Sequence, residues 1–397
     1  MEGLLNNHIR LISATNTTYY RYLYKDIDWS NRLIGITGAR GTGKTTMILQ
    51  HIKSTFEDLG KALYISLDNI YFTKNSLLDF AERFNAYGGT HLFIDEVHRY
   101  PNWSIEIKNI YDSFPDMSVV FTGSSILEIY KSNADLSRRA ISYRLTGLSF
   151  REYLNFEMGC DFPTYTLADI LKNHFNIAAE LTSKIKVMLH FENYLQSGFY
   201  PFYKENPVSY HARLQNVVNT ILENDLPSVE KVEYNTIIKI KKLLVILSSL
   251  VPYVPNIQSL STEIESNRAL TIKYLGYLQR AGLIILLNSE GKGKSRMAKP
   301  DKIFLDNTNV LYALCDLNVN KGTLRETFFV NQCRAVHSVA VGKKGDFSID
   351  NKFTFEVRGK NKSYKQIKDM EDSYIAMADI ELGFGNKIPL WLFGFLY

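Results

Sequence analysis

The chain has 397 residues, more than one domain usually holds, so we expect two or three units, each with its own core. Its formal net charge is only +5, and its three widely separated cysteines indicate neither a disulfide framework nor a zinc site. No stretch approaches the roughly 18 consecutive apolar residues of a membrane span, so we expect a soluble, cytoplasmic protein without a membrane partner.

The stretch from Leu33 to Thr46, LIGITGARGTGKTT, contains the pattern G-x-x-x-x-G-K-[ST]. It lies between an apolar run, which predicts a strand, and an amphipathic segment, which predicts a helix. Glycines let such a loop turn its N–H groups toward phosphate oxygens, and the N-terminus of the following helix adds partial positive charge. Lys44 would reach the β and γ phosphates, and Thr45 would ligate Mg²⁺. The predicted nucleotide-binding loop comprises Gly38, Ala39, Arg40, Gly41, Thr42, Gly43, Lys44, Thr45 and Thr46.

A second key element, HLFIDEVHR, is an apolar run that ends in two carboxylates. It predicts a buried parallel strand with Asp95 at its tip, where the side chain can hold Mg²⁺. Glu96 follows directly and is a candidate general base for water. A glutamate in this place is typical of the additional-strand class of P-loop ATPases, in which another strand separates the two motif strands. We therefore expect an α/β fold with a parallel sheet of this class.

The next predicted strand, Met117 to Ser125, would be that additional strand. Its end would face the γ-phosphate with one of three hydroxyls, and we favour Ser124 over Thr122 and Ser125. Arg139 precedes a further predicted strand. It is either an arginine finger that stabilises γ-phosphate charge across an oligomer contact, or a residue at a surface helix end.

These motifs, together with LFIDEVHRYPNW, FTGSSILEIY and RRAISYRLTGLSFREYL, resemble the AAA-type ATPases of bacteria and archaea that end in a restriction-endonuclease-like domain. That family is related to the archaeal ATPases and to the STAND signalling ATPases. The resemblance extends from near Leu33 to the C-terminus and implies Mg²⁺-dependent ATP hydrolysis. Two positions depart from the family pattern: Arg138 stands in place of a glycine, and Gly147 in place of a proline. No N-K-x-D motif follows the sensor strand, which argues against GTP.

From Ile237 the pattern predicts a helix, a short helix, a third helix ending at Ala281, and two strands joined by a basic turn. This order is that of a winged helix-turn-helix. The third helix would bury Ile272, Leu275 and Leu278 and leave more exposed Arg268, Lys273, Tyr274 and Tyr277. One interpretation places Arg268 and Lys273 near DNA, with phosphate contacts from Lys292, Lys294 and Arg296. The other makes the module a lid and protein-contact element.

The last part of the chain holds Asp346 and Glu356, separated by a predicted hairpin, with Arg358 two residues further on. This spacing resembles the D-x(n)-E-x-K core of restriction-endonuclease-like folds, in which two carboxylates bind Mg²⁺. Arginine remains charged and cannot act as a base, although Lys360 lies on the same predicted face. Glu326 belongs to the same candidate site. We expect a degenerate site rather than an active nuclease.

We therefore expect an ATPase domain with a helical lid over residues 1–205, a winged helix-turn-helix region over 206–298, and a small α/β, restriction-endonuclease-like domain over 299–397. Lys44, Glu96, Ser124 and Arg139 would serve catalysis, and Thr45 and Asp95 would hold the metal. Between residues 291 and 370, 16 Lys and Arg face 8 Asp and Glu, so double-stranded DNA is a candidate partner. A second copy of the chain is another candidate partner. Two alternatives to an ATP-driven machine remain: a slow ATP switch of the STAND type, and a metal-dependent nuclease.

Overall fold

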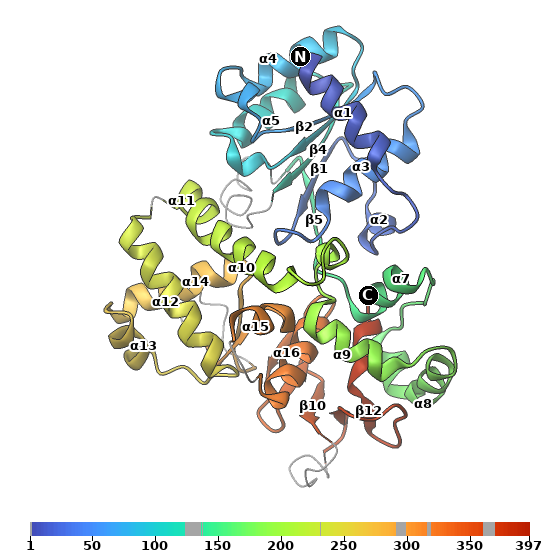
Figure 1. Cartoon of the computed structure of the whole chain (residues 1–397), viewed down its shortest axis with the longest axis vertical. Helices are drawn as coiled ribbons and strands as arrows, with labels where there is room; N and C mark the ends of the chain where they lie inside the picture. Colours follow the sequence, from blue (N-terminus) through green and yellow to red (C-terminus); the bar gives the residue numbers. More distant parts are fainter. Residues whose placement is uncertain are drawn as a thin grey trace. The chain divides into compact units, whose positions relative to one another are not determined.

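The computed structural model describes residues 2–123, 136, 138–230, 232–290, 299–315, 319–359 and 370–397. Internal contacts divide the chain, shown from blue to red in Figure 1, into two compact units. The first unit comprises Met1–Gly147 and Thr220–Val232, and the second comprises Leu148–Asn219 and Glu233–Tyr397. The chain therefore passes between the units three times. This division differs from the expected boundary at residue 205, because most of the presumed lid packs with the C-terminal part.

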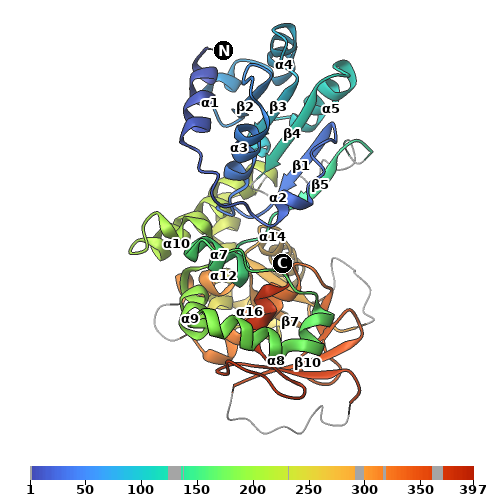
Figure 2. The same ribbon diagram turned by 90° about the vertical axis from the view of Figure 1, so that its right-hand side faces the viewer.

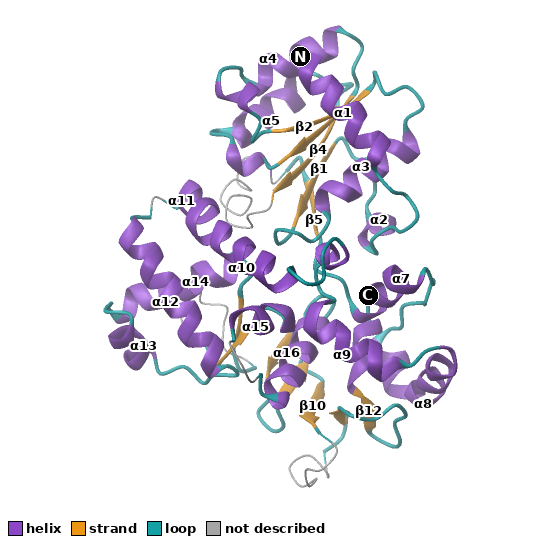
Figure 3. Ribbon diagram, viewed as in Figure 1, coloured by secondary structure: helices purple, strands orange, loops and turns teal. Residues whose placement is uncertain are grey.

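The first unit is built on a parallel sheet, whose strands are drawn in orange in Figure 3. Its described strands have the order β2-β3-β4-β1-β5. The strands are β1 (Leu33–Thr37), β2 (Ala62–Ser66), β3 (His91–Asp95), β4 (Ser118–Gly123) and β5 (Ile141–Arg144). β4 pairs with both β1 and β3, so it separates the strand before the glycine-rich loop from the strand that ends in Asp95. The predicted additional-strand fold is confirmed.

Helices cover both faces of this sheet (Figure 2). They are α1 (Glu2–Ala14), α2 (Leu23–Asp26), α3 (Lys44–Thr55), α4 (Leu77–Ala86) and α5 (Trp103–Ser113), with the short segments η1 (Ile70–Thr73) and η2 (Val97–Arg99). Alternate residues of the strands serve two cores, since Ile94 packs with Trp103 of α5, whereas Phe93 packs with Ile48 of α3. Strands buried on both faces carry continuous apolar runs, which explains the pattern of HLFID.

The segment Thr220–Val232 also belongs to the first unit, although more than seventy residues of the second unit precede it. It contains η4 (Ile221–Asp225), a single π-helical turn, and α11 (Leu226–Val229). π-helical turns occur frequently at functional sites. This segment brings Asp225 to the first unit.

The second unit combines helices with two small sheets. Its helical segments are α7 (Phe150–Met158), α8 (Leu167–Lys184), α9 (Val187–Ser197), η3 (Pro201–Lys204), α10 (Tyr210–Thr220), α12 (Tyr234–Leu250), α13 (Ile257–Glu263), α14 (Arg268–Arg280), α15 (Thr308–Leu314), α16 (Lys321–Cys333) and η5 (Leu390–Phe395). Its strands are β6 (Ile284–Leu287), β7 (Lys302–Leu305), β8 (Val339–Val341), β9 (Phe347–Ile349), β10 (Phe353–Arg358), β11 (Ser373–Met377) and β12 (Lys387–Pro389). β6 and β7 form an antiparallel pair. The described strands β8 to β12 form a mixed sheet in which β8-β9-β10 is antiparallel and β10-β11-β12 is parallel.

The motif LSFREYL explains why the chain after Gly147 joins the C-terminal part. Ser149 and Glu152 form a capping box at the start of α7. The Ser149 hydroxyl also donates to the backbone oxygen of Tyr397 at 2.8 Å, and Arg151 Nε donates to the same oxygen at 2.9 Å. Phe150 packs against Phe395. These contacts fix α7 within the second unit.

Three helices, α12, α13 and α14, and the pair β6 and β7 lie where the winged helix-turn-helix was expected. The predicted exposure of α14 is partly wrong: Tyr274 and Tyr277 are only 4% and 3% exposed, while Ile272 is half-buried. α14 is covered by α12, α13 and β6, which bury more of its surface than one apolar face. The basic residues Lys292, Lys294 and Arg296 lie outside the described residues. Within the described part of the chain, no helix has the length and apolar character needed to cross a membrane.

Candidate active site

The glycine-rich loop connects the end of β1 to the start of α3, as expected for a phosphate-binding loop. Gly41 and Gly43 have φ values of 83° and 94°, a region that glycine enters without steric cost. A Cβ atom on Gly38 would lie 2.2 Å from the backbone oxygen of Leu145, so this position requires glycine. The loop therefore closes tightly against the chain that leaves β5.

Lys44 is buried at the centre of this loop. Its Nζ atom donates to the backbone oxygens of Gly38 at 2.9 Å and Ala39 at 2.8 Å. Burial lowers the pKa of Lys44, while the nearby carboxylates of Glu96 and Asp95 act in the opposite direction. Among the described residues, the hydrogen-bond acceptors of this ammonium group are thus neutral backbone oxygens, which phosphate oxygens can replace.

Asp95 accepts hydrogen bonds from four groups of the described residues. Thr45 Oγ1 and Tyr64 OH donate to Oδ2 at 2.6 Å and 3.0 Å. The backbone N–H of Glu96 and the hydroxyl of Thr122 donate to Oδ1. The two expected metal ligands, Thr45 and Asp95, are therefore in direct contact.

The side chains at this position fit Mg²⁺. A carboxylate and a hydroxyl are the oxygen donors that Mg²⁺ prefers, and this ion is usually held by one or two carboxylates together with substrate phosphates. No group of three or more His, Cys, Asp or Glu that could hold a metal occurs among the residues the structure describes.

The predictions for the hydroxyl residues at the end of β4 have different outcomes. Ser124, our preferred sensor, lies outside the described residues, so its role stays a prediction. Thr122 points to Asp95 and contributes to the same site. Tyr64 was not anticipated, because only the pairing of β2 with β3 reveals that its hydroxyl reaches Asp95.

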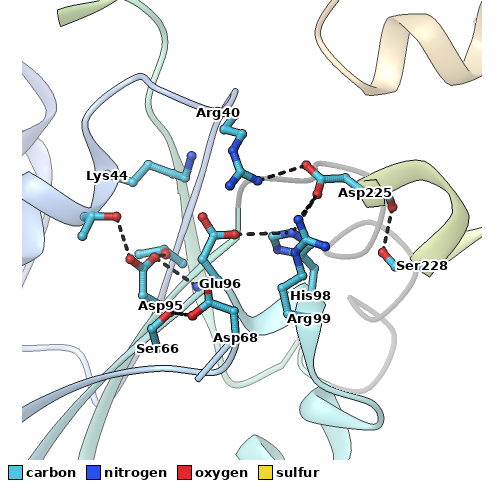
Figure 4. Close-up of polar contacts among 12 residues, drawn as sticks. Arg40, Lys44, Ser66, Asp68, Asp95, Glu96, His98, Arg99, Asp225 and Ser228 are labelled. Carbon is cyan, nitrogen blue, oxygen red and sulfur yellow. Dashed lines mark hydrogen bonds and ion pairs between the residues drawn. The ribbon is translucent and has the colours of Figure 1, made fainter. Parts of the chain in front are cut away.

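Glu96 lies directly beyond Asp95 with a left-handed backbone (φ 53°), which is uncommon for a residue other than glycine. Its Oε2 atom is 3.4 Å from His98 Nε2 (Figure 4). Asp225 lies on the other side of His98 and forms ion pairs with Arg99 at 2.7 Å and Arg40 at 3.6 Å. Sequence reasoning identified Arg40 only as part of the loop. It missed His98, Arg99 and Asp225.

Two further arginines of the first unit have different surroundings. Arg139 forms a bidentate pair with Asp112 of α5, at 2.9 Å and 3.0 Å, and its role as a finger stays a prediction. Arg21 is buried and donates to the backbone oxygens of Thr42, Thr146 and Gly147. It therefore ties the phosphate-binding loop to the chain after β5, a role that sequence reasoning missed.

The candidate nuclease residues are also partly brought together. Asp346 Oδ2 accepts the backbone N–H of Val357 at 2.8 Å, next to Glu356 in β10. Glu356 is 2% exposed and pairs with Arg358. Glu326 instead pairs with Lys302 at 2.6 Å. Glu356 and Glu326 are thus each paired with a cation of the chain. Lys360 lies outside the described residues.

Comparisons with known proteins cover parts of the chain. Residues 30–154 match a family described as an AAA domain, and residues 188–321 match a domain of unknown function (DUF8612). The uncharacterized protein MJ1637 of Methanocaldococcus jannaschii is 26% identical over 297 residues, which cover 71% of this chain and 62% of that protein. This chain therefore spans less than two thirds of that relative's length.

Two solved structures resemble the chain only distantly. C. elegans PCH-2 is 16% identical with a TM-score of 0.31, and the match covers 58% of this chain and 66% of that one. AMPPCP-bound DnaA from Aquifex aeolicus is 14% identical with a TM-score of 0.27, and the match covers 65% of this chain and 84% of that one. Similarity this low does not bear on function. The family match of residues 30–154 agrees with the sheet order and the glycine-rich loop described above, and the chain therefore contains an AAA-type P-loop ATPase domain.

Proposed function

We propose that this chain binds ATP together with Mg²⁺, hydrolyses it, and couples the reaction to a conformational change of its C-terminal parts. The observation that carries the proposal is the 2.6 Å contact between Thr45 and Asp95. It joins the first turn of the helix after the phosphate-binding loop to the strand end that carries Glu96. Phosphate, metal and water-activating groups thus converge at the carboxyl edge of one sheet.

Each residue has a distinct role in this proposal. Lys44 and the loop N–H groups bind the phosphates, and Thr45 and Asp95 hold the metal, which would neutralise phosphate charge. Glu96 accepts a proton from the attacking water. Ser124 contacts the γ-phosphate. Arg139 stabilises its charge from a neighbouring copy, which requires that the pair with Asp112 open on assembly.

The coupling and the partners also belong to the proposal. The three passages of the chain between its units provide covalent routes for a conformational change. The basic C-terminal region and Arg268 and Lys273 of α14 are the candidate contacts for double-stranded DNA. A nuclease activity is not favoured, because Glu356 and Glu326 are paired with cations.

Steady-state ATP hydrolysis with and without Mg²⁺ tests the central claim. Glu96→Gln should lower kcat by at least about 100-fold, the usual contribution of a general base, while ATP binding persists. Glu82→Gln is the matched control, since it removes the same charge from an exposed position on α4. Equal turnover of Glu96→Gln and wild type would refute the catalytic assignment.

The same assay with double-stranded and single-stranded DNA separates the alternatives. Turnover that rises several-fold with DNA supports a DNA-linked machine. Slow turnover that ignores DNA, together with ATP-dependent oligomerisation, supports a switch of the STAND type. DNA cleavage that disappears in Asp346→Ala would instead establish a nuclease.

A further inference from the structure

Asp225 is a buried acidic residue whose charged partners lie more than a hundred residues away in the sequence. Its segment, Thr220–Val232, packs with the first unit, while the residues on both sides of it belong to the second unit. The Asp225 side chain is only 1% exposed. Because a buried carboxylate is costly unless it is paired, its surroundings should explain its position.

Basic side chains from two loops of the ATPase domain surround this carboxylate (Figure 4). Arg99 Nη2 lies 2.7 Å and His98 Nε2 lies 3.7 Å from Oδ1, both from the loop that follows Glu96. Arg40 Nη1, from the phosphate-binding loop, lies 3.6 Å from Oδ2. Asp225 thus connects the loop that binds phosphates with the loop that carries the candidate base.

His98 extends this connection to Glu96. Its side chain is fully buried, and its Nε2 atom lies between Glu96 Oε2, at 3.4 Å, and Asp225 Oδ1, at 3.7 Å. A movement of Asp225 would therefore change the position of His98, and with it the orientation of the Glu96 carboxylate. A general base must lie within hydrogen-bond reach of its water, so this orientation affects turnover.

We propose that Asp225 is a positioning residue for ATP hydrolysis, which holds Arg99 and His98 so that Glu96 is oriented toward the attacking water. This inference rests on the proposed ATPase function. Because both ends of its segment continue into the second unit, a movement of that unit that withdraws Asp225 would slow hydrolysis. The segment Thr220–Val232 is then the element through which the C-terminal parts control the ATPase site.

Asp225→Asn removes the charge without changing the size of the side chain. It should lower kcat by about 10- to 100-fold, as expected for a misplaced catalytic group, while the affinity for a fluorescent ATP analogue changes far less. Glu223→Gln is the matched control, because it removes one negative charge from an exposed position of the same segment. Its kcat should equal that of the wild type.

A second readout does not depend on turnover. In nucleotide-free protein, Asp225→Asn should increase amide hydrogen exchange both in residues 97–100 and in the segment Thr220–Val232. Arg99→Gln should give the same pattern and should lower kcat, so it replaces Asp225→Asn if that variant does not fold. The double variant Asp225→Asn/Arg99→Gln should lose no more activity than the worse single variant, because both changes remove the same ion pair, that between Arg99 and Asp225.

The outcomes distinguish the two proposals. A wild type without turnover refutes the proposed function. A wild type that hydrolyses ATP and loses turnover in Glu96→Gln, but keeps its kcat in Asp225→Asn, refutes this inference alone. Unchanged exchange of residues 97–100 in Asp225→Asn would likewise overturn it.

Discussion

The hydrogen bond from Tyr64 to Asp95 offers a direct test of the site geometry. Tyr64→Phe removes one hydroxyl and leaves the buried ring in place. Burial and the Asp95 carboxylate raise the pKa of Tyr64 well above its usual range, so the hydroxyl stays protonated and donates throughout the working pH range. A hydrogen bond to a charged group contributes about 1.5–3 kcal/mol to stability. Since Asp95 keeps its other donors, we expect a loss near the lower end, about 1.5 kcal/mol.

Urea unfolding in the absence of nucleotide measures this loss. Tyr22→Phe is a suitable control, because the Tyr22 hydroxyl lies 3.3 Å from a neutral acceptor, the backbone oxygen of Arg144, in an exposed setting. This control should cost less than about 0.5 kcal/mol. If Tyr64→Phe costs no more than Tyr22→Phe, the hydroxyl does not support Asp95 and the described arrangement is wrong.

Three other variants address separate features. Gly38→Ala should weaken binding of a fluorescent ATP analogue by about tenfold or more, because its Cβ would lie 2.2 Å from the Leu145 oxygen; wild-type affinity would contradict the tight loop. Burial lowers the pKa of His51 from 6.5 to about 4. Below pH 6.5 the unfolded chain therefore takes up a proton that the native protein does not, and the free energy of unfolding decreases as the pH is lowered. His51→Gln should reduce the loss of unfolding free energy between pH 7 and pH 5 by about 2 kcal/mol, and an unaltered pH dependence would argue against a neutral buried imidazole. Arg358→Gln leaves the buried Glu356 carboxylate without its cation and should cost about 3 kcal/mol in urea unfolding, much of which Glu356→Gln should restore in the double variant.

Several features of the candidate site could be predicted because they are local in sequence. The glycine spacing, Lys44 and Thr45 lie within one short stretch of sequence, and the apolar run before Asp95 identifies a buried strand by composition alone. A glutamate after that aspartate was enough to predict that another strand separates the two motif strands, which the pairing of β4 with β1 and β3 confirms. Such features need only the neighbouring residues, because backbone geometry and burial set them over a few positions.

Tertiary structure alone decided the contacts between distant segments. Tyr64 meets Asp95 because β2 lies beside β3, and the apolar pattern of a parallel strand does not reveal which strand is its neighbour. Tyr274 and Tyr277 are buried because several elements cover α14, whereas a single-face pattern assumes one covered side. Asp225 reaches Arg40 and Arg99 only after the chain has passed through the second unit and returned. A carboxylate in a helical segment carries no local sign of a partner more than a hundred residues away, so only the folded chain identifies that connection.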